Sequence, residues 1–284
     1  MTSNLLTTAA DLQQVLSKPG SDCLVIDCSF DLADPAAGRR AFDAGHIRGA
    51  VYVSLDSTLT GAKTGRNGRH PLPDRDVFAR AMAALGVNAG TQVVACDNAG
   101  GIYAARLWWL LRWAGHAAVS VLDGGMAAWK SGNGAIEITP SAPRPAGNFR
   151  LLDSLVGSVG FQDVLTNIDS GERLVIDARA PDRFRGENET LDPVGGHIPG
   201  AVNRLFRNNL APDGRFKPAV ELRVEFTELA GDRAPSMLIS QCGSGVTACH
   251  NLLAMAVAGL PGAALYPGSW SEWCTQPGAP VATV

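Results

Sequence analysis

The sequence predicts an α/β fold in two tandem domains, each a small parallel sheet with helices on both faces. Its 284 residues are about twice the commonest domain size. One set of short phrases occurs twice in the chain, about 150 residues apart. Within each copy, short apolar runs alternate with helical patterns, and this alternation is typical of a parallel sheet with crossover helices.

The internal repeat determines the predicted number of domains. Val25-Ile26-Asp27 is followed by Gly-His-Ile-Arg-Gly-Ala-Val at 45–51, and Val175-Ile176-Asp177 is followed by Gly-His-Ile-Pro-Gly-Ala-Val at 196–202. Two further pairs of segments match in outline, 101–105 with 245–249 and 125–129 with 268–273. Such self-similarity indicates two copies of one domain. We predict domains at 1–138 and 153–284, joined by a proline-rich linker at 139–152.

The predicted sheets rest on three short apolar runs in each copy. Runs of this length are typical of buried parallel strands. We expect strands at Leu24–Asp27, Gln92–Cys96 and Ser120–Leu122 in the first copy, and at Leu174–Asp177, Ser236–Ser240 and Ala263–Tyr266 in the second. The second strand of each copy is followed by apolar residues at helical spacing, which predicts helices at Ala104–Trp113 and Ala248–Leu260.

Composition excludes several classes of function. Apolar residues make up 46% of the chain and charged residues 18%, with a net charge of −3. This balance excludes an extended disordered chain and a basic nucleic-acid binder. No nucleic-acid partner is therefore expected, whereas a small anionic substrate needs only one or two well-placed arginines.

The six cysteines indicate free thiols in a reducing compartment. They stand at 23, 28, 96, 242, 249 and 274, without any Cys-x-x-Cys pair, so neither a disulfide framework nor a zinc or dithiol motif is indicated. The first ten residues lack the pattern of a secretory signal. The longest apolar run, Leu252–Leu260, is too short to span a membrane. We predict a cytoplasmic protein without membrane association.

One loop carries the pattern of a nucleophilic site. Gln-Cys-Gly-Ser-Gly-Val-Thr at 241–247 lies between a predicted strand and a predicted helix. Its glycines allow the backbone to turn several N–H groups inward, and the helix adds its positive N-terminal end. We expect N–H groups of Gly243, Gly245, Val246 and Thr247 to surround Cys242 and to favour a nucleophilic thiolate without an adjacent histidine.

The alternative for Cys242 is a small buried apolar residue at a strand end, the usual role of a free cysteine. The surrounding glycines, serine and threonine argue against this, and the other five cysteines are interpreted as structural. The corresponding loop of the first copy is Cys-Asp-Asn-Ala-Gly-Gly-Ile at 96–102. Aligning Gly101 with Gly245 places Asn98 opposite Cys242, so we expect the first copy to lack the nucleophile and to serve in binding or support.

Three motifs together resemble the two-domain rhodanese-like sulfurtransferases over nearly the whole chain. They are the repeated Gly-His-Ile-x-Gly-Ala, Asp-Gly-Gly-x-x-x-Trp at 123–129, and Cys-Gly-Ser-Gly-Val-Thr-Ala at 242–248. The loop is similar to that of 3-mercaptopyruvate sulfurtransferases, whereas thiosulfate-specific members carry basic residues where this chain has Gly243 and Ser244. The resemblance implies two rhodanese-like domains, of which only the second holds the catalytic cysteine.

The resemblance also implies the reaction and its partners. Cys242 would accept sulfur from a small anionic donor, form a persulfide, and pass the sulfur to cyanide or a thiol such as reduced thioredoxin or a low-molecular-weight thiol. Neither a cofactor nor a metal is implied.

Further site residues follow from the same resemblance. Arg183 stands at the position expected to bind the donor carboxylate, and a guanidinium suits a planar carboxylate. Arg185 is a second candidate, equally well explained as a solvated charge. Asp56 and His70 match positions of a Ser-His-Asp relay with Ser244, which would help protonate the departing enolate. A histidine before proline is also often a simple surface or capping residue.

Two observations disagree on the donor. Relatives specific for mercaptopyruvate commonly carry a second arginine shortly after the first, and residues 187–194 contain none. We favour mercaptopyruvate because the loop touches the reacting sulfur, and thiosulfate is the alternative. His46 and His197 occur in both copies and are interpreted as structural.

Two other classes of function compete with sulfur transfer. A Cys-x5-Arg phosphatase needs an arginine six positions after the cysteine, and Ala248 stands there. A non-catalytic binding module or sulfur carrier fits the first copy, but Cys242 argues against it for the whole chain.

Overall fold

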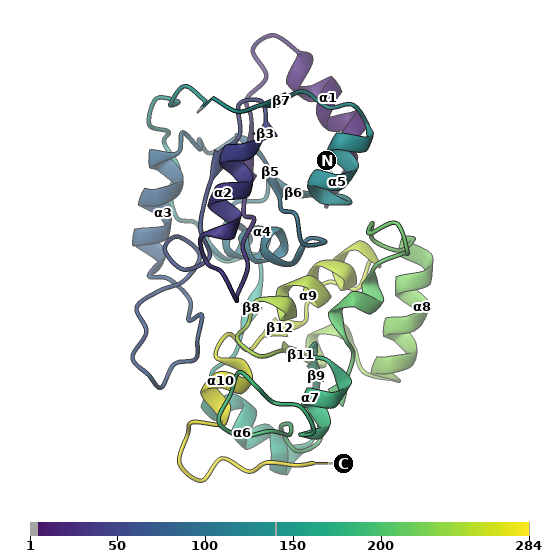
Figure 1. Ribbon diagram of the computed structural model, residues 1–284. Coiled ribbons are helices and arrows are strands. Elements are labelled where there is room, and N and C mark those ends of the chain that lie inside the picture. Colours follow the sequence, from purple (N-terminus) through teal and green to yellow (C-terminus); the bar gives the residue numbers. More distant parts are fainter. Residues whose placement is uncertain (1–4, 140, 284) are drawn as a thin grey trace. The chain divides into compact units, whose positions relative to one another are not determined.

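The chain forms two compact units (Figure 1). The structure is a computed structural model that describes residues 5–139 and 141–283. Residues 1–4, 140 and 284, which belong to the predicted first domain, linker and second domain, lie outside the described residues. The first unit contains the chain up to Gly61, Pro73–Leu155 and Pro212–Phe216. The second contains Ala62–Leu72, Val156–Ala211 and the chain from Lys217.

The first unit is built on a five-stranded parallel sheet with the strand order β1-β6-β5-β2-β4. Its strands are β1 (Leu6–Thr7), β2 (Cys23–Asp27), β4 (Val51–Tyr52), β5 (Gln92–Cys96) and β6 (Val119–Leu122). Its helices are α1 (Ala9–Ser17), α2 (Ala37–Ala44), α3 (Arg75–Ala84), α4 (Ile102–Trp113) and α5 (Gly125–Ser131). The short strands β3 (His46–Ile47) and β7 (Ile136–Glu137) form a separate antiparallel pair.

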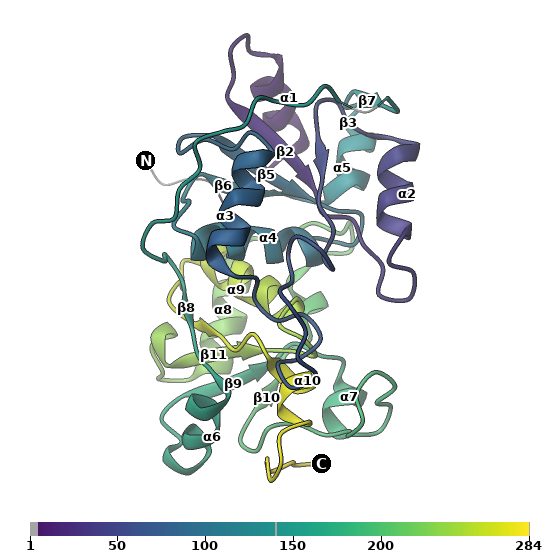
Figure 2. The same ribbon diagram turned by 90° about the vertical axis from the view of Figure 1, so that its left-hand side faces the viewer.

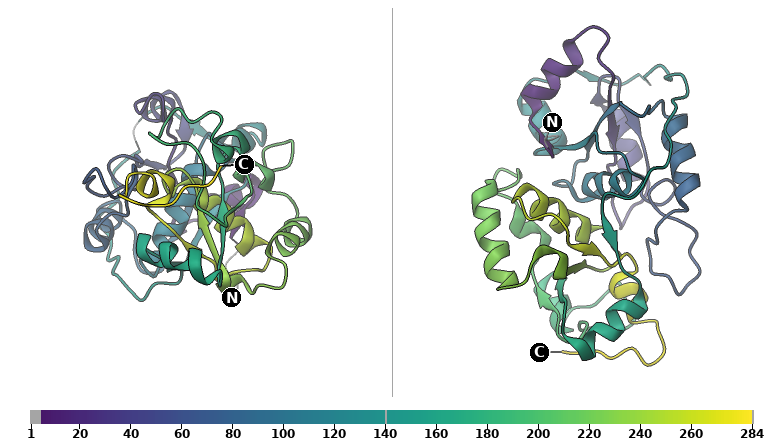
Figure 3. Two further views of the ribbon diagram at one scale, coloured as in Figure 1. Left: turned by 90° about the horizontal axis from the view of Figure 1, so that it is seen from below. Right: turned by 180° about the vertical axis from the view of Figure 1, so that it is seen from behind.

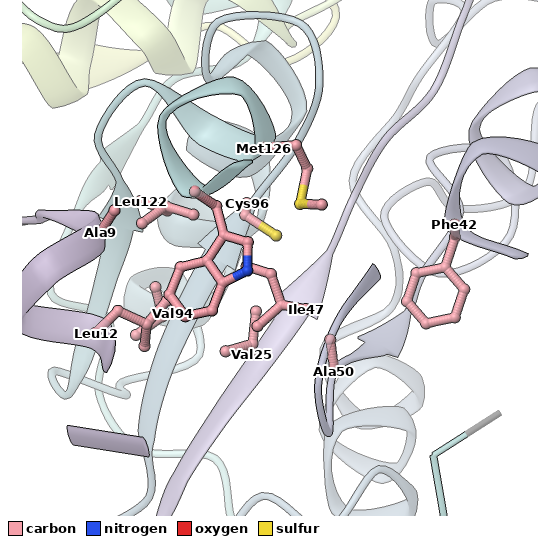
Figure 4. Close-up of a cluster of buried hydrophobic side chains, with 11 residues drawn as sticks. Ala9, Leu12, Val25, Phe42, Ile47, Ala50, Val94, Cys96, Leu122 and Met126 are labelled. Atoms are coloured by element: carbon pink, nitrogen blue, oxygen red, sulfur yellow. The ribbon is translucent and has the colours of Figure 1, made fainter. Parts of the chain in front are cut away.

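Helices cover both faces of this sheet. Figure 2 shows α3 and α4 toward one face and α1 and α5 toward the other. The core on the second of these faces is drawn in Figure 4, where Val25 of β2 and Val94 of β5 lie near Leu12 of α1 and Leu122 of β6. All four side chains are at most 2% exposed, so burial of apolar surface holds these elements together.

The second unit repeats this architecture with the strand order β8-β12-β11-β9-β10, again fully parallel. Its strands are β8 (Gly157–Ser158), β9 (Leu174–Asp177), β10 (Val202–Asn203), β11 (Leu238–Gln241) and β12 (Ala264–Leu265). Its helices are α6 (Phe161–Ser170), α7 (Pro181–Arg185), α8 (Ala219–Ala230), α9 (Thr247–Val257) and α10 (Ser269–Trp273), with 3-10 turns η1 (Phe206–Asn209) and η2 (Pro235–Met237).

Here too the sheet lies between helices. Figure 3 shows α8, in light green, and α6, in teal, on opposite sides of the strands. Val164 of α6, Ile239 of β11 and Trp273 of α10 belong to one fully buried cluster. The predicted α/β fold with two copies of a parallel sheet flanked by helices is therefore confirmed.

Element bounds differ from the sequence predictions mainly in the second unit. The strand expected at Ser236–Ser240 begins at Leu238, because Pro235–Met237 forms a 3-10 turn. The helix expected at Ala248–Leu260 covers Thr247–Val257 and ends before Gly259, whose φ of +72° breaks the helix. Within the described residues, none of the helices is long and apolar enough to cross a membrane.

Each unit is completed by a segment from the other half of the sequence. In the second unit, the Gln276 Nε2 group donates to the Arg66 carbonyl at 2.8 Å, and a Cβ on Gly68 would lie 2.7 Å from the Gly268 carbonyl oxygen. In the first unit, the Phe216 N–H donates to Asp123 Oδ1 at 2.8 Å. Residues 62–72 are therefore a structural part of the second unit.

Candidate active site

Cys242 begins the loop that joins β11 to α9, at the carboxyl end of the central strand of the second sheet. Ligand sites in open α/β sheets gather at this end of the strands. Two hydrogen bonds fix the start of this loop to α10. The Cys242 carbonyl accepts the Trp270 N–H and the Gly243 carbonyl accepts the Ser271 N–H, each at 2.9 Å. The Cys242 side chain is 2% exposed, so the thiol lies below the surface of the unit.

Two residues hold this loop in an unusual backbone conformation. Gly245 has a φ of +77°, and a Cβ there would lie 2.3 Å from the Pro267 carbonyl oxygen, so only glycine fits. Ser269 has a φ of +54°, which is uncommon outside glycine. Its Oγ accepts the Cys242 N–H at 3.1 Å and donates to the Tyr266 carbonyl at 2.8 Å. Ser269 thus fixes the backbone of the candidate nucleophile.

The loop that follows β5 in the first unit corresponds to the loop that follows β11 in the second. The residue-by-residue correspondence in the structure differs by one position from the one predicted from the sequence. Strand pairing places Cys96 opposite Asp27 and Gln241 opposite Asp177. The following helices begin at Ile102 and Thr247, and the glycine of positive φ before each helix's capping residue is Gly100 in one loop and Gly245 in the other. The residue opposite Cys242 is therefore Asp97.

The prediction that Asn98 stands opposite Cys242 is wrong for a simple reason. Gly100 and Gly101 are adjacent in the sequence, and both have positive φ, so the sequence alone did not distinguish them. Hydrogen bonds of the backbone carbonyl group give the same answer as the strand register. The Asp97 carbonyl accepts the Met126 N–H at 3.0 Å, as the Cys242 carbonyl accepts the Trp270 N–H at 2.9 Å.

Asp97 shows what this loop does with an anion. Its carboxylate is 1% exposed and accepts four backbone N–H groups at 2.8–2.9 Å, from Ala99, Gly101, Tyr103 and Ala104. The corresponding residues in the second unit are Ser244, Val246, Ala248 and Cys249. The first unit therefore builds a backbone anion cradle after its central strand, and Cys242 stands at the corresponding position of the second unit.

This correspondence changes the expected set of N–H donors. Val246 belongs to both the predicted ring and the corresponding set, and the correspondence adds Ser244, Ala248 and Cys249. The Cys249 N–H donates to the Val246 carbonyl at 3.1 Å. The predicted contributions of the Gly243, Gly245 and Thr247 N–H groups remain predictions.

Ser244 and His70 lie together in the second unit. Ser244 Oγ and His70 Nδ1 form a hydrogen bond of 2.8 Å, and both residues are buried. His70 reaches this place because it belongs to the segment 62–72, which completes the second unit. Asp56 belongs to the first unit, where its N–H donates to Ser54 Oγ at 3.3 Å. Its part in the relay remains a prediction.

Arg183 is held beside the loop by two carboxylates. Its guanidinium forms a two-pronged contact of 2.9–3.2 Å with Glu189 and reaches Asp192 Oδ2 at 3.3 Å. The Arg183 side chain is 19% exposed, so it remains partly accessible to a ligand. Arg185 instead pairs with Glu187 on the exposed surface, at 2.6 Å, as expected of a solvated charge.

The two carboxylates beside Arg183 have opposite pKa shifts. Burial raises the pKa of Glu189, but the Leu191 N–H and the Arg183 guanidinium outweigh it and bring the pKa below its usual value. Burial raises the pKa of Asp192 above its usual value, although Arg69 and Arg183 oppose the increase. Segment 187–194, which lacks an arginine of its own, thus supplies acidic partners to arginines from other segments.

Sequence reasoning missed four residues of this site: Arg69, Glu189, Asp192 and Ser269. Arg69 directly precedes His70 in the sequence, and that adjacency was the available signal. The roles of the two carboxylates depend on contacts between distant segments, and a serine of positive φ leaves no mark on the sequence.

The remaining cysteines and histidines fit structural roles. Burial raises the pKa of Cys23 and of Cys274 to about 11, and raises the pKa of Cys28 and Cys96 well above the usual thiol value. These four thiols therefore stay protonated at neutral pH.

His46 and His197 have the same surroundings in the two units. Each stacks on a phenylalanine, Phe42 or Phe184, at 3.8–3.9 Å between ring centroids, and each bonds that residue's carbonyl through Nδ1 at 2.8–2.9 Å. Among residues 5–139 and 141–283, no group of three or more His, Cys, Asp or Glu side chains is placed to hold a metal ion.

Comparisons with known proteins agree with this geometry. The model of the rhodanese-like domain matches residues 8–132 and 161–276. A probable 3-mercaptopyruvate sulfurtransferase of Pseudomonas aeruginosa is 45% identical, over 100% of this chain and 99% of its own. A thiosulfate sulfurtransferase of Cricetulus griseus is 36% identical over 90% and 86% of the two chains. A crystal structure of a 3-mercaptopyruvate sulfotransferase from Escherichia coli matches with a TM-score of 0.80 and 31% identity, over 95% of this chain and 100% of the other.

Proposed function

The chain belongs to the rhodanese-like domain family, and from this premise we propose that it is a sulfurtransferase whose preferred donor is 3-mercaptopyruvate. The observation that carries the proposal is Cys242 at the head of a backbone loop whose counterpart binds a carboxylate through four N–H groups. A site that stabilises an anion there favours both a thiolate before transfer and a persulfide anion after it.

The first half-reaction moves one sulfur atom onto Cys242. The thiolate attacks the donor sulfur and forms an S–S bond, while the C–S bond of mercaptopyruvate breaks and its electron pair stays on carbon. The departing enolate takes a proton and becomes pyruvate. In the second half-reaction an acceptor thiolate attacks the outer sulfur of the persulfide, and Cys242 leaves as the thiolate again.

We assign the proton delivered to the enolate to the pair formed by Ser244 and His70. Their hydrogen bond of 2.8 Å is short enough for proton transfer, and Ser244 lies two residues after the nucleophile. Asp56 would complete the relay by orienting His70. Thiosulfate would not need this proton, because sulfite leaves as a stable anion.

Arg183 is the proposed partner of the donor carboxylate, since its side chain is 19% exposed and a guanidinium matches a planar carboxylate. Arg185 is the weaker candidate because Glu187 already pairs with it. Mercaptopyruvate is favoured over thiosulfate by the similarity to the mercaptopyruvate enzymes and by the absence of basic side chains at positions 243 and 244.

The acceptor in this proposal is a thiol, either a reduced thioredoxin or a low-molecular-weight thiol. Because all six cysteines are free thiols, we place the reaction in a reducing compartment, the cytoplasm. Residues 62–72, which carry His70, belong to the second unit together with Cys242.

The test is the mass of the protein after reaction with 3-mercaptopyruvate and removal of the excess donor. We expect a gain of one sulfur atom at Cys242, removed by added thiol with recovery of the original mass. Cys242→Ser should gain nothing, whereas Cys274→Ser, which removes another thiol of the same unit, should behave like the wild type. An unmodified wild-type protein, or an adduct that persists in Cys242→Ser, would overturn the proposal.

A further inference from the structure

Two guanidinium groups, and not one, lie beside the residue that follows the candidate nucleophile. A Cβ on Gly243 would lie 2.9 Å from Arg69 Nη2 and 3.6 Å from both Nη1 and Nη2 of Arg183. All three residues belong to the second unit. A side chain at position 243 would therefore displace the Arg69 guanidinium, and glycine leaves both cations in place next to the loop.

Asp192 joins these two guanidinium groups. Its Oδ1 contacts Arg69 Nη1, and its Oδ2 lies 3.3 Å from Arg183 Nη2. The Asp192 side chain is 3% exposed, whereas those of Arg69 and Arg183 are 30% and 19% exposed. The carboxylate is therefore more deeply buried than the two arginine side chains that it joins, and both of these remain partly exposed.

The local charges almost cancel. Arg69 and Arg183 contribute two positive charges, and Glu189 and Asp192 contribute two negative charges when ionised. Arg179 also lies 3.5 Å from Glu189, but its charge is balanced by Asp177 at 2.6 Å. A ligand with one carboxylate gains two directional guanidinium contacts without needing a strongly positive site. A ligand with two negative charges loses more hydration on entry and finds little net positive charge to compensate it.

We propose that Arg69 is a second donor-binding residue, and that Asp192 is a positioning residue whose charge selects donors with a single negative charge. This inference rests on the proposed sulfurtransferase function and adds its donor specificity. The carboxylate of mercaptopyruvate binds between Arg69 and Arg183, and its sulfur points to Cys242. Thiosulfate, with two negative charges, is the disfavoured donor.

The first experiment measures kcat and KM for 3-mercaptopyruvate in Arg69→Gln and Arg66→Gln. Arg66 lies in the same segment and is exposed, so its replacement removes one positive charge away from the loop. We expect Arg69→Gln to raise KM about ten- to hundredfold with little change in kcat, as for the loss of a charge-assisted hydrogen bond. Equal KM values in the two variants would overturn the role of Arg69.

Removal of Arg69 alone leaves the buried Asp192 less compensated, so that variant could lose stability. The double variant Arg69→Gln/Asp192→Asn avoids this, because no carboxylate is left without its partner. It should show the same rise in KM for mercaptopyruvate as Arg69→Gln, with circular dichroism like that of the wild type. A folded double variant with the wild-type KM would overturn the proposal.

The second experiment compares the two donors in Asp192→Asn. Removing this negative charge should raise kcat/KM for thiosulfate relative to mercaptopyruvate by about three- to tenfold, because a dianion gains more than a monoanion from the same change in charge. An unchanged ratio would contradict the role of Asp192. The mass test on the wild-type protein separates the proposed sulfurtransferase function from this proposal on donor specificity. If the persulfide forms and these specificity effects are absent, the proposed function stands and only this inference fails.

Discussion

The loop after β5 in the first unit and the loop after β11 in the second correspond in position and differ in chemistry. Their backbones differ at the residue before the helix, where φ is +90° at Gly101 and −89° at Val246. In the first, the Asp97 carboxylate fills the cradle of N–H groups through four hydrogen bonds. In the second, the corresponding side chain is the Cys242 thiol. A loop that binds a carboxylate in one unit thus corresponds to the loop that carries the candidate nucleophile in the other.

The difference extends to the neighbours of the nucleophile. Ala99 corresponds to Ser244, and the segment Gly-Arg-Phe at 214–216 of the first unit resembles Gly-Arg-His at 68–70 of the second. The thiol, the hydroxyl and the imidazole are therefore replaced together in the first unit, by a carboxylate, a methyl group and a phenyl ring. The first unit joins its central strand to the following helix without these three groups, so chemistry is the better explanation for them in the second unit.

The largest effect is expected when the anion of the first loop is placed in the second. Cys242→Asp should abolish persulfide formation and sulfur transfer, because a carboxylate cannot accept a sulfane sulfur. The variant should nevertheless fold with a Tm at or above that of the wild type, since its carboxylate would collect the N–H groups of the loop. Intact-mass analysis and thermal melting measure both, with Cys242→Ser as the control. An unfolded Cys242→Asp would contradict the equivalence of the two cradles.

The second effect concerns stability in the first unit. Asp97→Asn should reduce the free energy of unfolding by about 2–4 kcal/mol, because an amide replaces one oxygen acceptor by a donor that faces N–H groups. Urea denaturation measures the change. Asp31→Asn is the control, since Asp31 is exposed and its Oδ1 accepts the Ala33 N–H at 2.8 Å. A loss for Asp97→Asn no larger than that of the control would show that the cradle does not depend on its anion.

Two interior strands, β5 and β9, were predictable because each is a short, mainly apolar run. Gln92–Cys96 and Leu174–Asp177 have the predicted bounds. The edge strands β1, β4, β8 and β10 contain two residues each, so no periodicity marks them, and their position follows only from pairing with a neighbour. Sequence periodicity therefore gave the core of each sheet, and tertiary pairing added its edges.

The candidate site divides in the same way. Cys242 and its glycine-rich loop are local in sequence, so their chemistry could be inferred from residue types alone. Arg69 and Asp192 are 123 positions apart and meet only in the folded second unit. The one-residue error in aligning the loops arose because two adjacent glycines look alike in sequence, whereas hydrogen bonds of the Asp97 and Cys242 carbonyl groups distinguish them.

The third prediction concerns Ser244, which is replaced by the alanine that stands at the corresponding position 99 of the first loop. Ser244→Ala should lower kcat for 3-mercaptopyruvate by about ten- to hundredfold, the usual contribution of a positioned proton donor. With thiosulfate the same variant should retain the wild-type kcat, because sulfite needs no proton on leaving. Steady-state kinetics with both donors provides the internal control. An equal loss with both donors would mean that Ser244 positions the loop instead of moving a proton.

The smallest effect concerns the stabilities that the two carboxylates beside Arg183, Asp192 and Glu189, contribute at different pH values. Burial raises the pKa of Asp192 in the folded protein, so ionisation of this carboxyl group opposes folding. The cost in stability is absent below the pKa of Asp192 in the unfolded chain and grows as pH rises through its pKa in the folded protein. Burial also acts on Glu189, but the Leu191 N–H and Arg183 lower its pKa, so its ionisation supports folding and that support is lost as pH falls through the folded pKa.

The two shifts give opposite slopes of stability with pH. From about pH 3.5 to pH 7, the stability of the wild type relative to Asp192→Asn should fall, and its stability relative to Glu189→Gln should rise. Urea denaturation at several pH values measures both differences. The effects are small because burial and pairing act in opposite directions at each carboxylate. Parallel slopes would mean that the two acids share one environment, and Asp192 would then lose its distinct place beside the two arginines.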